Sequence, residues 1–254
     1  MVTEDVPPLV SVVTPFHNTA PYLAECIESV LRQTYSNFEY VLVNNRSTDA
    51  SAEIARRYAD SDRRIRFVET RDLLPQVHNY NYALAQISPR SSYVKMVEAD
   101  NWIYPDCLSR MVALAEAHPR VGIVSSYCTT ETAVRFHGLH ISRNVVPGRD
   151  AARTHFLDHA YWFGAPTTVL MRASFVRSRK PFYSETASIA EDLMACYDAL
   201  KELDLGFVHQ VLTFVRTQNE SLISRTRNIP GVMLWDRLVL LQHCGRAESS
   251  SAYE

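Results

Sequence analysis

The chain has 254 residues, enough for one large α/β domain or two small ones. Hydrophobic residues make up 46% and charged residues 21%, a composition typical of a globular protein rather than a disordered one. The formal net charge of -2 provides no basic surface of the kind that nucleic-acid binding requires, which argues against nucleic acid as a partner.

The cysteines and the first residues bear on where the protein works. Five cysteines are scattered without C-x-x-C spacing, which favours a reducing compartment over a disulfide framework or a structural zinc site. The opening MVTEDVPPLVSVV has no basic segment, and its apolar run is too short for a signal peptide. No stretch approaches the ~20 apolar residues of a membrane span. We therefore expect a cytoplasmic protein with at most peripheral membrane contact.

Strands and helices alternate through the first half of the chain. Residues 9–15 (LVSVVTP) form a β-branched run typical of a strand buried on both faces. Residues 21–33 follow with apolar side chains at helical spacing, and residues 38–43 (FEYVLV) predict the next buried strand. The same alternation predicts strands over residues 65–68, 93–97 and 121–126, and helices over residues 50–58, 77–87 and 105–117.

This alternation predicts an α/β fold with a doubly wound, Rossmann-like, mostly parallel sheet flanked by helices. Beyond about residue 127 the pattern loosens. There the sequence predicts strands over residues 164–171 and 207–214 and a helix over residues 191–203. With no repeat and no Gly-, Pro- or Ser-rich linker, we expect a single domain over residues 1–254. Its parts would be a first half (9–127), a smaller second half (128–225), and a C-terminal helix and tail (226–254).

Three polar segments fall at the ends of predicted strands, at residues 14–18, 44–49 and 98–101. Ligands of open α/β sheets bind beyond the carboxyl ends of the strands. The sharpest signal is Glu98-Ala99-Asp100, because paired carboxylates suit Mg²⁺ or Mn²⁺, which in turn bind diphosphate oxygens. A solvated turn that caps the next helix is the alternative. No G-x-x-x-x-G-K-[ST] or G-x-G-x-x-G motif occurs, so a metal bridge would have to hold any phosphate.

Three segments of the chain form a known pattern, namely VSVVTPFHNTAPYLAECIESVLRQTYSNFEYVLVNNRSTDAS, YVKMVEADNWIYPDCL and, more loosely, VLTFVRTQNESLIS. Through them the chain resembles the inverting family 2 glycosyltransferases, which have the GT-A fold. It covers roughly residues 9–225. The resemblance implies that the first half binds a nucleotide sugar and that the second half, the acceptor part, binds the acceptor.

The resemblance also implies roles for the residues that match the family's motifs. Asp100 would ligate Mn²⁺ or Mg²⁺, and Glu98 would face the metal or the ribose. Glu191 and Asp192 match an E-D pair, which makes Asp192 the candidate general base. Thr14, Pro15 and Phe16 would line the base pocket, and Arg216 and Gln218 would lie near the phosphates. The other expected donor-binding residues are Asn18, Asn45, Ser47, His78, Asn79 and Ala99.

Several positions depart from the family pattern. Asn44 and Asn45 replace the usual aspartates, although an asparagine can still accept a hydrogen bond from a base N–H. A UDP-sugar is therefore expected as donor, with a TDP- or GDP-sugar as alternatives. Gln218 stands where a histidine is common, and His78-Asn79 stands where A-R-N is common. The implied reaction transfers the sugar, with inversion, to a hydroxyl of a glycan, a lipid-linked acceptor or a small molecule.

Two other functions are compatible with the same residues. A nucleotidyltransferase can share this kind of sheet and carboxylate pair, but it would normally need a glycine-rich or basic loop after the first strand, which residues 14–18 lack. A nucleotide-sugar-binding protein that has lost turnover would explain Asn44, Asn45 and Glu98. Asp100 and Asp192, the two acids that the mechanism most needs, argue for the active enzyme.

Overall fold

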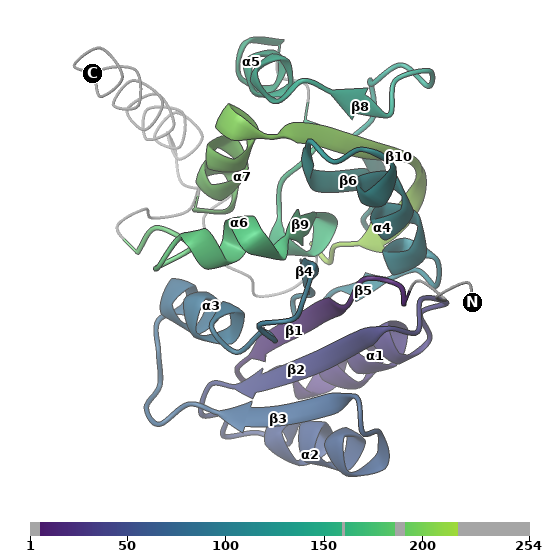
Figure 1. Ribbon diagram of the computed structural model, residues 1–254. Coiled ribbons are helices and arrows are strands. Elements are labelled where there is room, and N and C mark those ends of the chain that lie inside the picture. The colour runs from purple at the N-terminus through teal and green to yellow at the C-terminus, as the bar shows by residue number, and fades with distance from the viewer. Residues whose placement is uncertain (1–5, 159–160, 186–190, 218–254) are drawn as a thin grey trace, which may run out of the picture.

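The computed structural model describes residues 6–158, 161–185 and 191–217 (Figure 1). These residues form one 10-stranded sheet with helices on both faces. The strands are β1 (Val10–Phe16), β2 (Phe38–Asn44), β3 (Ile65–Glu69), β4 (Tyr93–Met96), β5 (Trp102–Ile103), β6 (Val121–Thr129), β7 (Val134–Arg135), β8 (Val145–Val146), β9 (Leu170–Arg172) and β10 (Asp204–Phe214).

The helices bury one face each, as their apolar spacing predicts. In the first of them, Leu23, Cys26, Ile27 and Val30 are buried at the i, i+3, i+4 and i+7 positions. The helices are α1 (Ala20–Leu31), α2 (Ser51–Ser61), α3 (Gln76–Leu84), α4 (Cys107–Ala117), α5 (Gly148–Asp158), α6 (Ala173–Ser178) and α7 (Glu191–Glu202), and a 3₁₀ turn, η1, spans Pro166–Thr168.

The strand order is β3-β2-β1-β4-β9-β6-β10-β5, with β7 paired to β6 and β8 to β10. The long pairings, β1 with β2 and β4, β2 with β3, and β6 with β10, are all parallel. The antiparallel pairings in the described chain are at most three residue pairs long. The order reverses between β1 and β4, which makes that point the switch of a doubly wound sheet. The predicted α/β class and mostly parallel sheet are confirmed.

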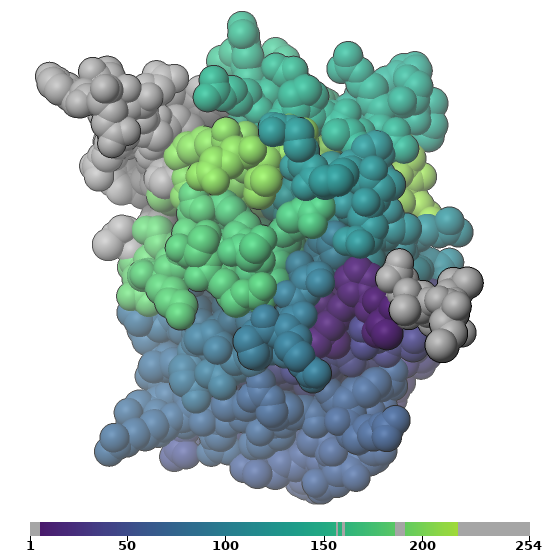
Figure 2. Space-filling model, in the orientation of Figure 1, coloured from purple at the N-terminus to yellow at the C-terminus, as the bar shows by residue number. Residues whose placement is uncertain are grey.

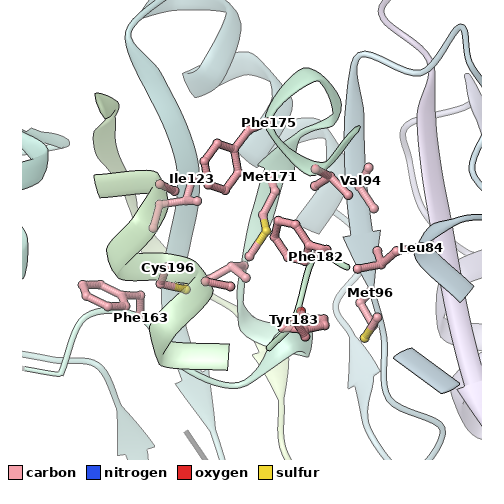
Figure 3. Close-up of a cluster of buried hydrophobic side chains, with 14 of the residues drawn as sticks. Leu84, Val94, Met96, Ile123, Phe163, Met171, Phe175, Phe182, Tyr183 and Cys196 are labelled. Atoms are coloured by element: carbon pink, nitrogen blue, oxygen red, sulfur yellow. The ribbon is translucent and has the colours of Figure 1, made fainter. Parts of the chain in front are cut away.

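The side chains of the central strands divide the core into two layers. Along β4 and the residue after it, Val94 and Met96 belong to one buried cluster and Tyr93 and Val97 to the other, as a two-residue period requires. Figure 3 shows the first layer, where Met171 of β9 lies among side chains of α3, α6 and α7. The second layer packs against α1, α2 and α4.

The regular first part and the later part of the chain lie at opposite ends of the molecule (Figures 1 and 2). β1, β2 and β3 form one end, coloured purple to blue. β6 and α4 instead pack with β10 at the other end, although they precede residue 130 in sequence. The described part of the chain contains no helix long and apolar enough to cross a membrane.

The sequence misassigned part of the second half. The strand predicted over residues 164–171 is the 3₁₀ turn η1 followed by the short strand β9. The cause is local, because Pro166 has no N–H for a ladder and the Thr168 hydroxyl bonds back to the Ala165 carbonyl at 2.7 Å. The helix expected from residue 105 begins at Cys107. The sequence did not predict β5, β7, β8, α5 and α6, and the C-terminal helix and tail expected over residues 226–254 lie outside the described residues.

Candidate functional site

The loops that follow β1 and β2 are tied together by Asn18. Its side-chain oxygen accepts hydrogen bonds from the backbone N–H groups of Thr48 (2.7 Å) and Asp49 (3.3 Å), and its own N–H donates to Ser47 Oγ (3.0 Å). Asn18 and Arg46 have left-handed φ angles of 52° and 57°, which are costly outside glycine and cluster at functional sites. The structure thus brings Asn18 and Ser47 together, where they join the two loops.

Asn45 is 3% exposed, and its amide holds the loop after β3. Its Oδ1 accepts hydrogen bonds from the Leu74 N–H (2.8 Å) and from Thr70 Oγ1 (3.2 Å), while its Nδ2 donates to the Leu74 carbonyl (2.8 Å). The backbone groups of Leu74 determine which end of the amide is oxygen. The single Thr70 hydroxyl proton also lies within reach of the Asn44 carbonyl, with Oγ1 at 3.4 Å from that oxygen. A base could therefore be met either by Oδ1, in place of Thr70, or by the second amide N–H of Asn45.

Asn45→Asp is expected to lower the free energy of unfolding by about 1–3 kcal/mol, because a carboxylate oxygen would face the buried Leu74 carbonyl without a proton between them. Burial and this contact raise the pKa of the new carboxyl, so the loss is largest above that pKa and shrinks as the pH falls through it. Thermal unfolding near neutral pH and near pH 5 measures both effects. Asn45→Ala should lack this pH dependence, and equal melting temperatures for Asn45→Asp and wild type would contradict the prediction.

The end of β1 supports the site from inside the core. Thr14 is fully buried, with its hydroxyl 2.9 Å from the Tyr40 hydroxyl. Phe16 is 2% exposed, and Pro15 is buried. A base pocket at this place would meet the backbone of these three residues rather than their side chains.

The carboxylate of Glu98, two residues after the end of β4, is held from two sides. Its Oε1 accepts a hydrogen bond from Tyr80 (3.0 Å), and its Oε2 accepts from Thr167 Oγ1 (3.1 Å) and Asn101 Nδ2 (3.1 Å). Thr167 Oγ1 in turn accepts from the Glu98 N–H (3.0 Å) and from Asn101 Nδ2 (3.1 Å). A carboxylate has about four lone-pair positions, so these three donors leave Glu98 about one.

Negative charge accumulates around Glu98. Burial of the carboxyl group, followed by the charge of Asp100, raises the pKa of Glu98 above its usual range, against the lowering effect of the Tyr80 and Thr167 hydrogen bonds. The charge of Asp192 adds to the increase. A carboxylate in this position is stabilised by any cation that binds beside it.

Arg216 braces the turn between Glu98 and Asn101. Its backbone N–H donates to Asn101 Oδ1 (2.8 Å), its Nε donates to the Asp100 carbonyl (3.0 Å), and its Nη2 forms an ion pair with Glu25 (3.0 Å). The sequence suggested that Arg216 lies near donor phosphates. Its guanidinium lies against the backbone of the acidic turn, where Ala99 is buried, and over the ring of Tyr22 at 4.6 Å. Gln218 lies outside the described residues.

Glu191 and Asp192 begin α7, and the charge of Asp192 acts on Glu98. Glu191 is 8% exposed, and Asp192 Oδ1 accepts a hydrogen bond from the Leu193 N–H (2.7 Å). Burial above all, with smaller contributions from charges that include Asp192 and Glu98, raises the pKa of Tyr183 well above its usual value. Acidic groups from the end of β4 and from the start of α7, which are far apart in sequence, thus both act electrostatically on Tyr183.

α3 brings His78 and Asn79 to this region. His78 Nε2 lies 3.3 Å from Glu185 Oε2. Asn79 is 4% exposed, and no other described residue bonds its Oδ1. A buried acceptor of this kind is normally satisfied by water or by a ligand. Asn79 therefore retains a polar atom for a ligand.

Sequence reasoning missed three residues of this network, namely Tyr80, Thr167 and Lys95. Tyr80 directly follows the predicted pair His78-Asn79 on α3. Thr167 was assigned to a strand, although Pro166-Thr167-Thr168 is a combination that also favours turns. Lys95 interrupts a predicted buried apolar strand, and a lysine at such a position indicates a specific role because lysines are rarely buried.

The acidic residues fit a divalent cation that shares its coordination with a ligand. Across the described ranges, no group of three or more His, Cys, Asp or Glu side chains could hold a metal ion. Mg²⁺ and similar ions are commonly bound through one or two carboxylates together with substrate phosphates and water. Asp100, beside the largely satisfied Glu98, suits that arrangement.

The chain is similar in sequence to known glycosyltransferases. The family described as Glycosyl transferase family 2 matches residues 11–179. The glycosyltransferase GlyA of Streptococcus pneumoniae is 34% identical over 131 residues, which are 50% of this chain and 18% of GlyA. The putative glycosyltransferase EpsE of Bacillus subtilis is 31% identical over 180 residues, 70% of this chain and 61% of EpsE.

Two solved structures share the fold. TarS of S. aureus in complex with UDP-GlcNAc has a TM-score of 0.70 at 17% identity, covering 85% of this chain and 60% of the TarS chain. The mannosyltransferase PcManGT of Pyrobaculum calidifontis, in complex with GDP-Man and Mn2+, has a TM-score of 0.67 at 19% identity, covering 96% and 65%. The chain spans less than two thirds of the length of each of these four proteins. Because the family match extends over more than half of the sequence, the chain belongs to glycosyl transferase family 2.

Proposed function

We propose that this chain transfers a sugar from a nucleotide diphosphate sugar, with a UDP-sugar favoured, to an acceptor hydroxyl with inversion. The observation that carries the proposal is the acidic turn of Glu98 and Asp100 at the switch point of the sheet, on which the charge of Asp192 also acts. Two of these acids follow β4 and the third begins α7, yet the charges of Asp100 and Asp192 both act on Glu98. Such a pairing of a donor-side turn with a candidate base suits a direct displacement.

The choice of nucleotide is supported from two directions. TarS was solved with UDP and with UDP-GlcNAc, whereas PcManGT was solved with GDP-Man and Mn2+, so both donor types occur on this fold. Asn45 has a second amide N–H beside the one bonded to Leu74, and a carbonyl oxygen of uracil could accept it. Asn79, with its unsatisfied buried oxygen, is a further candidate for contact with the donor.

The mechanism assigns separate tasks to the three acids. Asp100 would hold Mn²⁺ or Mg²⁺, which when bound supplies positive charge opposite the departing diphosphate. Glu98, restrained by Tyr80 and Thr167, keeps the turn in the orientation that Asp100 needs. Asp192 would take the proton of the acceptor hydroxyl as its oxygen attacks the anomeric carbon. The bond to the nucleotide diphosphate breaks as the new glycosidic bond forms.

Thermal unfolding with UDP, TDP, GDP, ADP and CDP, each with and without Mn²⁺, tests the donor site. A ligand at ~100 times its Kd adds about 2.7 kcal/mol to the free energy of unfolding, which is roughly 5–10 °C for a chain of this length. We expect one diphosphate, UDP first, to produce this shift only with metal. No shift with any nucleotide would contradict the proposal. Donor binding without hydrolysis or transfer over a broad acceptor panel would favour a binding protein without turnover.

A further inference from the structure

A lysine lies in the middle of the sheet, three residues before Glu98. Lys95 belongs to β4, between β1 and β9, and is 0% exposed. Its ammonium lies 3.3 Å from the Val169 carbonyl oxygen and 3.8 Å from Met111 Sδ. Within the part of the chain that the structure describes, no carboxylate forms an ion pair with it.

This position is unfavourable for an ammonium group. The group has three donors, and the Val169 carbonyl is its only strong acceptor among the described contacts, since a thioether accepts weakly. Burial lowers the pKa of Lys95 below its usual value, because the charged form has left water. A methionine has a similar length and would avoid this cost. The role of the lysine must therefore be sought in the carbonyl that it holds.

That carbonyl belongs to the segment that supports Glu98. Val169 links η1 to β9 and lies in neither. η1 carries Thr167, whose hydroxyl bonds both the backbone N–H and the carboxylate of Glu98. The segment with Thr167 and Val169 is thus held at two points. Lys95 of β4 donates to the Val169 carbonyl, and Glu98, two residues after β4, is bonded to the Thr167 hydroxyl.

We propose that Lys95 is a positioning residue for the donor site, because its hold on Val169 sets the place of Thr167 and through it the orientation of Glu98 and of the turn to Asp100. The proposal rests on the proposed function in one respect, that Glu98 and Asp100 belong to the donor site. The link from Lys95 to Glu98 is a structural statement that a measurement without ligand can test.

Lys95→Met tests the link because its effects are expected to have opposite signs. Removal of a buried charge should raise the melting temperature. Loss of the hydrogen bond from Lys95 to the Val169 carbonyl should at the same time increase hydrogen–deuterium exchange in a peptide covering residues 97–101, where the Glu98 N–H is bonded to Thr167. Mn²⁺-dependent binding of the nucleotide that the wild type binds should weaken about tenfold. This is the lower end of the range for changes to residues that orient a metal ligand. A lysine with no positioning role would leave exchange and binding unchanged.

A double-mutant cycle identifies the route of the effect. Thr167→Val removes the hydroxyl at constant shape and should also increase exchange in residues 97–101. If Lys95 acts through Thr167, the two changes together should have little more effect than Thr167→Val alone. Lys180→Met, at an exposed lysine, is the matched control and should change neither exchange nor binding.

Three results would overturn the proposal: unchanged exchange at residues 97–101 in Lys95→Met, full additivity with Thr167→Val, or an equal effect of Lys180→Met. If the wild type binds no nucleotide, the proposed function fails, but the exchange measurement still decides the role of Lys95. If Lys95→Met does not fold, Lys95→Leu is measured in the same way and with the same expected signs.

Discussion

Asp192→Asn is expected to reduce turnover by about 10²–10⁴-fold, the range that a general base supplies, while donor binding stays unchanged. Asparagine has the shape of aspartate but cannot take up the proton of the acceptor hydroxyl. Its side-chain oxygen can still accept the hydrogen bond from the Leu193 N–H, so the start of α7 should remain folded. Turnover is measured as sugar transfer or donor hydrolysis, and donor binding as the nucleotide-induced shift in melting temperature.

The matched control for this variant lies on the same helix. Asp198 forms an ion pair with Lys201 at 2.6 Å, and it lies well over one turn beyond Asp192. Asp198→Asn should therefore leave turnover unchanged. Wild-type turnover in Asp192→Asn would remove Asp192 from the mechanism, whereas a loss of donor binding together with turnover would indicate a role in the donor site.

Asp100→Ala is expected to abolish the metal-dependent part of nucleotide binding. At a ligand concentration that shifts the wild type by roughly 5–10 °C with Mn²⁺, the variant should show almost no shift. The reason is that the three hydrogen bonds to Glu98 leave it about one lone pair, so it cannot replace Asp100 as the principal ligand. The melting temperature without ligand is measured alongside, so that any change in folding is separated from the loss of the metal-dependent shift.

Asp106→Asn serves as the control for a nearby acid outside this cluster. Asp106 accepts a hydrogen bond from Thr34 Oγ1 at 2.9 Å, which an amide oxygen can also accept. This variant should keep the full metal-dependent shift. If Asp100→Ala keeps it as well, then the metal is bound elsewhere or is not needed for nucleotide binding.

Much of the fold could be predicted because its signals are local. Buried β-branched runs marked β1 and β2, and helical apolar spacing marked α1. In the second half, the prediction was wrong at residues 164–171, where the apolar run resembles a strand. There Pro166 and the side chains of Thr167 and Thr168 direct the backbone into a 3₁₀ turn.

The chemistry of the candidate site was also visible in part. Glu98 and Asp100 could be named because paired carboxylates at a strand end suit a metal, whereas Asp192 was named only through the resemblance to family 2 glycosyltransferases. The residues that surround these acids could not be predicted from the sequence. The bond between Glu98 and Thr167 spans 69 positions, and the bond between Lys95 and Val169 spans 74. Contacts at such separations leave no periodic trace in one sequence.

The sequence by itself therefore determined the α/β class and the order of the main elements, and it indicated candidate acids, since short-range periodicity and strand-end chemistry depend on neighbouring residues. Only the tertiary structure decided which atoms remain open to a ligand. It showed that the oxygen of Asn45 is used by Leu74 and Thr70, and that the carboxylate of Glu98 is nearly satisfied. Each polar atom makes few hydrogen bonds, and the fold decides which partners take them.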